Sequence, residues 1–195
     1  MMVKICGITN REDALAAIDG GAAALGFNFS PASPRYIAPD EAADIAAGLA
    51  AGVWKVGVFV DESAEAVLRT AWQVGLDIAQ LHGSESPEQY PRGIRVWKAI
   101  RMLSKAGKTA CPTLGVEAVL LDGPASGEVF DWARVPQGIA KLILAGGLDA
   151  GNVREAIEQV RPWGVDACSQ IESSPGRKDR FKMAAFLKAA LAASR

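Results

Sequence analysis

Residues 4–9 have the sequence Lys-Ile-Cys-Gly-Ile-Thr, and this stretch determines how the chain begins to fold. Its apolar residues predict a short buried strand, Gly7 permits a sharp turn, and Thr9 or Asn10 is expected to cap a helix. Cys6 then stands at the carboxyl end of the strand, where parallel α/β folds carry their reactive side chains. Free cysteines are also among the most buried residues, so position alone leaves a catalytic and a packing role equally open.

The composition predicts one soluble domain spanning residues 1–195. Half of the residues are hydrophobic, which is enough for one substantial core. The formal net charge is −1, with 21 Lys and Arg against 22 Asp and Glu, so we expect neither nucleic acid nor a membrane as a partner. No apolar run reaches bilayer length, and no signal-like segment precedes the first strand. Any anionic ligand is expected to be bound locally.

The cysteines indicate a reducing compartment. Cys6, Cys111 and Cys168 are odd in number and widely spaced, which fits neither a disulfide framework nor the spacing of zinc ligands. We therefore expect reduced thiols and a cytoplasmic protein. Cys111 has no role that the sequence assigns.

Strands and helices alternate along the whole chain. Eight short apolar runs predict buried strands around residues 3–5, 22–27, 53–60, 77–81, 94–100, 116–121, 141–145 and 164–166. Helices are expected over residues 13–19, 40–51, 63–74, 152–160 and 178–193, with a short one beginning at residues 86–88. Residues 104–113 are ambiguous.

This alternation predicts an α/β fold, a compact (β/α)8 TIM barrel, because parallel strands need crossovers that cover the sheet. Such barrels usually have about 250 residues. With 195 residues, some crossovers must be short, and residues 102–115 and 123–136 are the expected places. Residues 28–39 contain three prolines and predict a surface loop.

In such a barrel the carboxyl ends of the strands meet at one face, which predicts the site. The residues at these ends are Cys6, Asn28, Arg35, Gln80, His82, Lys98, Asp122, Gly146, Gly147 and Asp166. Two loops after the last two strands, one with Gly146 and Gly147 and one with residues 166–169, resemble the phosphate site of barrels. Ordinary turn glycines are the alternative.

Asp122 and Cys6 are a candidate acid and base. Asp122 ends an apolar run, and partial burial would raise its pKa and suit it to general-acid work. A thiolate opposite could act as base if cations lower its pKa, and Lys4 points to the same side of the strand as Cys6. A helix or turn cap is the alternative for Asp122.

Two further polar residues have both a ligand-binding and a structural reading. Arg35 sits on a proline-bounded loop, and its guanidinium suits a planar carboxylate, although the pattern by itself favours a solvated surface arginine. His82 is the only histidine, and no partner carboxylate is evident. We assign it, like Gln80, to the lining of the pocket.

Taken together, these motifs resemble those of the phosphoribosylanthranilate isomerases of tryptophan biosynthesis. The resemblance covers nearly the whole chain, through KICGIT at 4–9, GFNFSPASPRYI at 26–37, VGVFV at 56–60, QLHG at 80–83, LLD at 120–122, FDW at 130–132, LAGGL at 144–148 and GVDACSQIESSPGRKD at 164–179. It implies a barrel without metal or organic cofactor and an Amadori rearrangement of a small phosphorylated substrate.

The resemblance also implies residue roles. Asp122 would be the general acid, Cys6 the general base, and Arg35 the ligand of the anthranilate carboxylate. The phosphate would be held, mainly by backbone groups, at Gly146, Gly147, Asp166, Ala167 and Cys168. The family's last loop usually reads close to GVDVSSGVE, so Cys168 here replaces a serine and Gln170 a glycine. The loop after Asp122 lacks the usual GGTG segment.

Two other functions fit the same barrel. One is a histidine-pathway or bifunctional sugar isomerase, in whose family an aspartate stands at the position of Cys6. The other is a barrel that has lost catalysis and serves as a binding protein. We expect a monomer or a weak homodimer.

Overall fold

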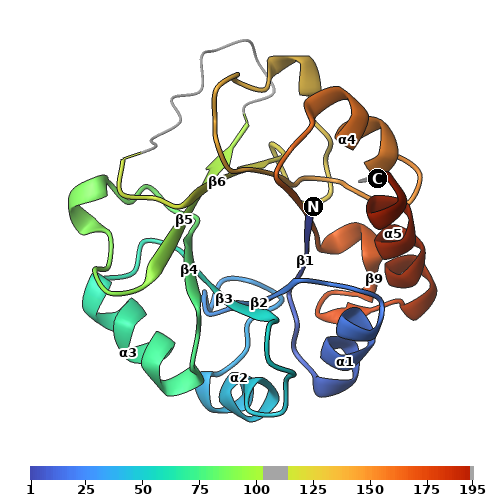
Figure 1. The fold of residues 1–195 in the computed structure, drawn as a ribbon. Coiled ribbons are helices and arrows are strands. Elements are labelled where there is room, and N and C mark those ends of the chain that lie inside the picture. Colours follow the sequence, from blue (N-terminus) through green and yellow to red (C-terminus); the bar gives the residue numbers. More distant parts are fainter. Residues whose placement is uncertain (103–113, 194–195) are drawn as a thin grey trace.

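The computed structural model describes residues 1–102 and 114–193. Eight parallel strands form a closed barrel in which consecutive strands are neighbours and the last pairs with the first, as Figure 1 shows. The strands are β1 (Met2–Cys6), β2 (Ala24–Asn28), β3 (Trp54–Phe59), β4 (Ile78–Leu81), β5 (Arg95–Arg101), β6 (Ala118–Asp122), β7 (Leu142–Leu144) and β8 (Gly164–Ala167). The predicted (β/α)8 barrel is confirmed.

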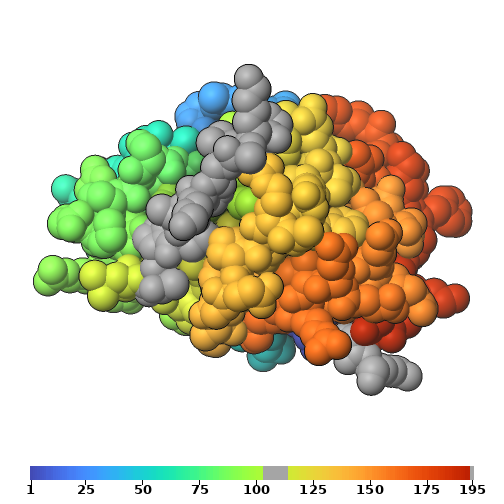
Figure 2. All heavy atoms as spheres, turned by 90° about the horizontal axis from the view of Figure 1, so that it is seen from above, coloured from blue at the N-terminus to red at the C-terminus, as the bar shows by residue number. Residues whose placement is uncertain are grey.

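Five α-helices within the described residues cover the outside of the barrel (Figure 1). They are α1 (Arg11–Asp19), α2 (Pro39–Ala46), α3 (Ala64–Val74), α4 (Val153–Val160) and α5 (Arg180–Ala193). Short 3-10 helices are η1 (Pro87–Gln89), η2 (Trp132–Arg134) and η3 (Ser169–Ile171). Seen from above in Figure 2, the yellow to orange residues lie between the green residues and the red residues near the C-terminus.

Local sequence sets the helix ends. The Asn10 side chain accepts a hydrogen bond from the backbone N–H of Asp13 at 2.8 Å, and Ser63 caps α3 in the same way from Ala66. Gly75 ends α3 with a left-handed backbone, φ +71°, which glycine adopts without strain. The expected N-cap at residue 10 is therefore present.

Some predicted boundaries are wrong. The helix expected over 40–51 covers Pro39–Ala46 only, because Gly48 and Gly52 follow and glycine is a poor helix former. The last helix begins at Arg180, since residues 177–178 form a strand instead. The expected helix at 86–88 is a single 3-10 turn.

The connections after β5 and β6 are short. Residues 123–136 contain only η2, as expected of a reduced crossover. The connection expected over 102–115 falls largely outside the described residues, as do the ambiguous segment 104–113 and Cys111.

A small hairpin after β8 is absent from the sequence prediction. β9 (Glu172–Ser174) and β10 (Arg177–Lys178) pair antiparallel, joined by a turn at Gly176 with φ +79°. Strands of three and two residues are too short to show a hydrophobic period. The hairpin places Glu172 and Lys178 beside the end of β1, and Lys178 donates its backbone N–H to Asp13 on α1.

The core has two layers. Inside the barrel, apolar side chains fill the lower part, including the fully buried Trp97, which packs edge-on against Trp54 and Trp163. A second layer, between the strands and the helices, includes Val3 and Ile5 of β1 and Phe186 of α5. Alternation along each strand separates the two layers.

The same alternation positions the site. On β1 the side chains that point into the barrel are those of Met2, Lys4 and Cys6. The apolar Met2 lies at the amino end of the strand, and the two polar residues lie toward its carboxyl end. On β6 the series is Ala118, Leu120 and Asp122. The barrel therefore closes its amino end with apolar side chains and opens its carboxyl end as a polar pocket. In the parts of the chain described, no helix is both long and apolar enough to cross a bilayer.

Candidate active site

A cavity of about 340 Å³ lies at the carboxyl ends of the strands. It is lined by Cys6, Asn28, Ser30, Ala32, Ser33, Arg35, Val58, Val60, Gln80, His82, Arg101, Leu120, Asp122, Ala125, Ser126, Gly127, Ala145, Gly146, Gly147, Leu148, Asp166, Cys168, Ser169 and Gln170. Of the ten strand-end residues predicted for the site together with Ala167 and Cys168 of the last loop, all except Lys98 and Ala167 are in this set.

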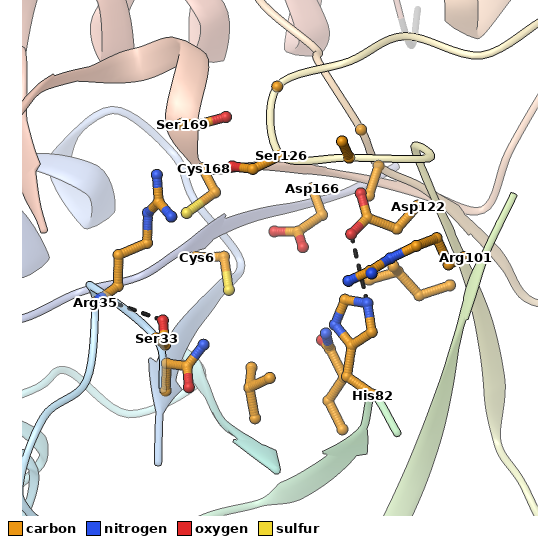
Figure 3. Close-up of a pocket in the computed structure, with 18 of the residues that line it drawn as sticks. Cys6, Ser33, Arg35, His82, Arg101, Asp122, Ser126, Asp166, Cys168 and Ser169 are labelled. Atoms are coloured by element: carbon orange, nitrogen blue, oxygen red, sulfur yellow. Dashed lines mark hydrogen bonds and ion pairs between the residues drawn. The ribbon is translucent and has the colours of Figure 1, made fainter. Parts of the chain in front are cut away.

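Cys6 and Asp122 occupy facing walls of this cavity, as Figure 3 shows. Cys6 comes from the end of β1, and Asp122 from the end of β6, three strands away around the ring. Strand alternation turns both side chains inward rather than toward the helices. The thiol and the carboxyl therefore face the same space, which a ligand of moderate size can fill.

A buried ion pair lies beneath Cys6. Nζ of Lys4 is 2.8 Å from Oδ2 of Asp166, and the Lys4 side chain is fully buried. Burial raises the pKa of Asp166 to about 7, against the opposing charge of Lys4. For Lys4, burial alone would lower the pKa, but the charges of Asp166 and Cys6 raise it above 10.5. The lysine is therefore a permanent cation next to the thiol.

The environment of Cys6 favours a thiolate. A hydrogen bond from the thiol of Cys168 and the positive charges of Lys4 and Lys178 lower the pKa of Cys6 well below 9.0, outweighing burial. The same thiol pairing raises the pKa of Cys168 well above its ordinary value. Of the two cysteines, Cys6 is therefore the one that favours the thiolate form.

Asp122 has the opposite tendency. Burial raises its pKa above the ordinary 3.8, while the charge of His82 and a backbone hydrogen bond from Gly123 oppose the rise. Nε2 of His82 lies 3.4 Å from Oδ2 of Asp122 (Figure 3). No sequence pattern indicates this carboxylate partner of His82. Burial lowers the pKa of His82, so the imidazole is mainly neutral near pH 7.

Arg35 faces a carboxylate of its own chain. Its Nη2 donates to Oε2 of Glu172 at 2.7 Å, and its Nε donates to both carboxylate oxygens at 3.0 and 3.1 Å. Burial raises the pKa of Glu172, but hydrogen bonds from Arg35 and Lys178 outweigh it and hold that pKa below 4.5. Glu172 therefore fixes the plane of the Arg35 guanidinium at the edge of the cavity.

The glycine pair after β7 packs tightly against the loop after β6. Gly146 and Gly147 have φ of +85° and +66°, which only glycine adopts easily. A Cβ on Gly146 would lie 2.2 Å from the backbone nitrogen of Gly123, and one on Gly147 would lie 2.7 Å from Val129. Both glycines are needed so that the two loops can meet at the cavity.

Three of the predicted residues, Gln80, Ala167 and Lys98, differ in how they lie relative to the cavity. Gln80 is buried in the cavity wall, and within the described part of the chain no hydrogen-bond partner reaches its Oε1. Ala167 is buried and directed away from the cavity by the alternation of β8, so only its backbone is near the site. Lys98 points outward and pairs with Glu85 at 2.8 Å, so its place among the strand-end residues of the pocket is wrong.

The cavity also contains residues that the sequence reading missed. Arg101 ends β5, and Figure 3 shows its guanidinium beside Asp122 and His82. The inward series Trp97, Ala99, Arg101 could have indicated it. Ser126 and Ser169 line the cavity near Cys168 (Figure 3), so hydroxyl groups remain in the region where Cys168 replaces a serine. Loop residues have no periodicity that could reveal them.

Barrel and site together define a class of protein. A closed (β/α)8 barrel whose strand ends open into a pocket lined by a cysteine, a buried carboxyl and a glycine-rich edge is typical of an enzyme. In residues 1–102 and 114–193, no group of three or more His, Cys, Asp or Glu lies together as a metal site would require.

Comparison with known proteins identifies the family. The profile of N-(5′-phosphoribosyl)anthranilate (PRA) isomerase matches residues 3–189. The N-(5′-phosphoribosyl)anthranilate isomerase of Solibacter usitatus is 48% identical over 199 residues, 99% of this chain and 98% of that protein. The chain therefore belongs to the N-(5′-phosphoribosyl)anthranilate isomerase family, a family of isomerases.

Solved structures agree with this assignment. The phosphoribosyl anthranilate isomerase of Thermus thermophilus superposes with a TM-score of 0.90 at 40% identity, over 100% of both chains. A second isomerase, solved in complex with reduced 1-(o-carboxyphenylamino)-1-deoxyribulose 5-phosphate, has a TM-score of 0.84 at 38% identity, over 98% of this chain and 99% of that one.

Proposed function

We propose that this protein catalyses the Amadori rearrangement of N-(5′-phosphoribosyl)anthranilate to 1-(2-carboxyphenylamino)-1-deoxyribulose 5-phosphate, with Asp122 as general acid and Cys6 as general base. The observation that carries the proposal is the placement of these two side chains on facing walls of one cavity. Family membership supports the substrate, since a relative of known structure binds a reduced form of the product.

The acid step falls to Asp122. A protonated carboxyl donates its proton to the ribose ring oxygen, the C1–O bond breaks, and the anthranilate nitrogen forms a Schiff base with C1. Burial, which raises the pKa of Asp122, increases the protonated fraction at neutral pH. His82, 3.4 Å away, orients the carboxyl.

The base step falls to Cys6. Its thiolate removes the proton from C2 of the Schiff base, and the electrons move to the nitrogen to give an enolamine. This enolamine tautomerises to the ketone product. The permanent charge of Lys4 stabilises the thiolate before the proton arrives. Acid and base act from different sides of the sugar, as their positions on β6 and β1 require.

The remaining residues hold the two ends of the substrate. Arg35 binds the anthranilate carboxylate, with Glu172 holding its guanidinium in place. Backbone groups of the two final loops bind the phosphate, at Gly146, Gly147, Asp166, Ala167 and Cys168. Gln80 and His82 line the cavity between the site of the carboxylate and the site of the phosphate. None of these steps needs a metal or an organic cofactor.

The test is an assay of the loss of substrate fluorescence in the purified protein. Cys6→Ser and Asp122→Asn should each lower kcat by about 10²- to 10⁴-fold, because each removes one proton-transfer group. Cys111→Ser and Asp44→Asn, an exposed carboxylate of α2, are the matched controls and should keep full activity.

Three outcomes separate the alternatives. Turnover of the anthranilate substrate that depends on Cys6 and Asp122 supports the proposal. Preference for a substrate with two phosphates points to a histidine-pathway type of isomerase. Absence of turnover with either substrate in the folded wild-type chain indicates a binding protein and refutes the proposal.

The same proposal places the enzyme in the cytoplasm, with a small phosphorylated molecule as its partner and as a monomer or a weak homodimer. Sedimentation velocity over a range of concentrations measures the association. A constant dimer at the lowest concentration would contradict the weak association.

A further inference from the structure

The structure brings two cysteines to the same corner of the pocket. β1 and β8 pair in register up to Ile5 opposite Ala167, and Cys6 and Cys168 are the residues that directly follow this last pair. Neighbouring strands lie about 4.8 Å apart, and disulfides join residues whose Cα atoms are roughly 4.4–6.8 Å apart. The strand spacing beside the two cysteines therefore lies within the range that a disulfide can span.

The two side chains also share one space. Both line the cavity, and Figure 3 shows them side by side on its wall. A Cβ on Gly7, the residue after Cys6, would lie 2.9 Å from Sγ of Cys168, so this sulfur packs directly against the turn that follows Cys6. Both thiols are free and partly exposed to the cavity, which a small reagent can enter.

We propose that Cys6 and Cys168 form a redox modification site, at which a low-molecular-weight disulfide such as glutathione disulfide joins them in a reversible intramolecular disulfide. Loss of activity on oxidation rests on the proposed function of Cys6, whereas formation of the bond does not.

The chemistry proceeds in two exchanges. The Cys6 thiolate attacks one sulfur of glutathione disulfide, forms a mixed disulfide and releases one glutathione thiolate. Cys168 then loses its proton and its sulfur attacks Sγ of Cys6, expelling the second glutathione. The proton of Cys168 leaves with one of the two glutathione molecules. The protein loses two electrons, and the glutathione disulfide gains them.

The surroundings favour this sequence. Nζ of Lys178 lies 3.8 Å from Sγ of Cys168, and Lys4 lies beneath Cys6, so cations flank both sulfurs when they become thiolates. The hydrogen bond to Cys6 and burial raise the pKa of Cys168, so Cys168 stays protonated until the first exchange has occurred; Oε1 of Glu172, 3.9 Å from its Sγ, acts in the same direction. Cys6 is therefore the attacking and Cys168 the resolving cysteine.

The experiment uses the full chain, reduced and freed of reductant. It is incubated in buffers of increasing ratio of oxidised to reduced glutathione, quenched with an alkylating reagent, and studied by intact mass and by peptide mapping. The same samples are assayed for isomerase activity before and after dithiothreitol. Cys168→Ser and Cys111→Ser chains are treated in parallel, each compared with its own reduced form.

We expect the wild-type chain to lose two hydrogens without gaining glutathione, and to yield one crosslinked peptide pair containing Cys6 and Cys168. Activity should fall in proportion to this species and return with dithiothreitol. Cys168→Ser should instead carry glutathione on Cys6, and Cys111→Ser should behave like the wild type.

Separate glutathione adducts on Cys6 and Cys168 in the wild-type chain, or a crosslink to Cys111, would overturn the proposal. A chain that forms the Cys6–Cys168 crosslink but has no isomerase activity when reduced would leave the redox site standing and refute the proposed function instead.

Discussion

Nε2 of His82 lies 3.4 Å from Oδ2 of Asp122, at the mouth of a barrel that contains no other histidine. His82 follows β4 and Asp122 ends β6, and β5, which ends in Arg101, lies between these two strands. The contact means that the protonation of the candidate acid depends on a second titratable group.

While it is protonated, His82 lowers the pKa of Asp122, so His82→Gln should raise the pKa of Asp122 in the pH range where the imidazole carries its charge. The acid is active while protonated, and the alkaline limb of the kcat/KM profile should therefore move to higher pH. A pH profile of the variant beside that of the wild type measures this. An unmoved limb would show that Asp122 does not control it.

Arg35→Lys should raise KM for the anthranilate substrate by about 10- to 100-fold, because lysine cannot reproduce a two-pronged contact with a carboxylate. Steady-state kinetics measure the effect. Arg180→Lys, at an exposed arginine of α5, is the matched control and should leave KM unchanged. Thermal melting checks that loss of the Glu172 contact has not unfolded the variant; an unchanged KM in a folded protein would remove Arg35 from the binding site.

The glycine at position 146 should tolerate no side chain. Gly52→Ala, at φ +95° with no atom within 4 Å of the added Cβ, should cost about 1–2 kcal/mol from backbone strain alone. Gly146→Ala adds a clash 2.2 Å from the backbone of Gly123 and should cost a further ~2 kcal/mol. Urea unfolding of both variants measures the difference, and equal costs would contradict the tight meeting of the two loops.

The buried Lys4–Asp166 pair predicts a pH dependence of stability. The folded pKa of Asp166 is about 7, above the ordinary 3.8, so its contribution is fully present below pH 3.8 and is lost as the pH rises through 7. The Cys6 thiol, whose folded pKa is lowered, contributes with the opposite sign, so the measurement uses Cys6→Ser chains.

In the Cys6→Ser chain, the urea concentration at the midpoint of unfolding should decrease as the pH rises from 5 to 8. Adding the two substitutions Lys4→Met and Asp166→Asn together should remove most of this pH dependence. Lys4→Met alone leaves Asp166 without its cation and should destabilise the chain by about 3–5 kcal/mol when the carboxyl is ionised. A slope that survives in the combined variant would have to come from another group.

Much of the fold follows from local sequence. Alternating apolar runs and helical segments predict eight strands, and those strands form the observed ring. Parallel strands buried on both faces are continuous apolar runs, and a helix or loop must return the chain each time. The β9–β10 hairpin escaped prediction because strands of three and two residues carry no period.

The sequence by itself determined which residues stand at the strand ends, because a strand's carboxyl end is a local property of the chain. It therefore identified Cys6, Asp122, His82 and the glycine pair. Only the tertiary structure decided which of these groups meet. His82 with Asp122, Arg35 with Glu172, and Cys6 with Cys168 are separated by 40 to 162 positions in the chain, and closure of the barrel brings each pair together.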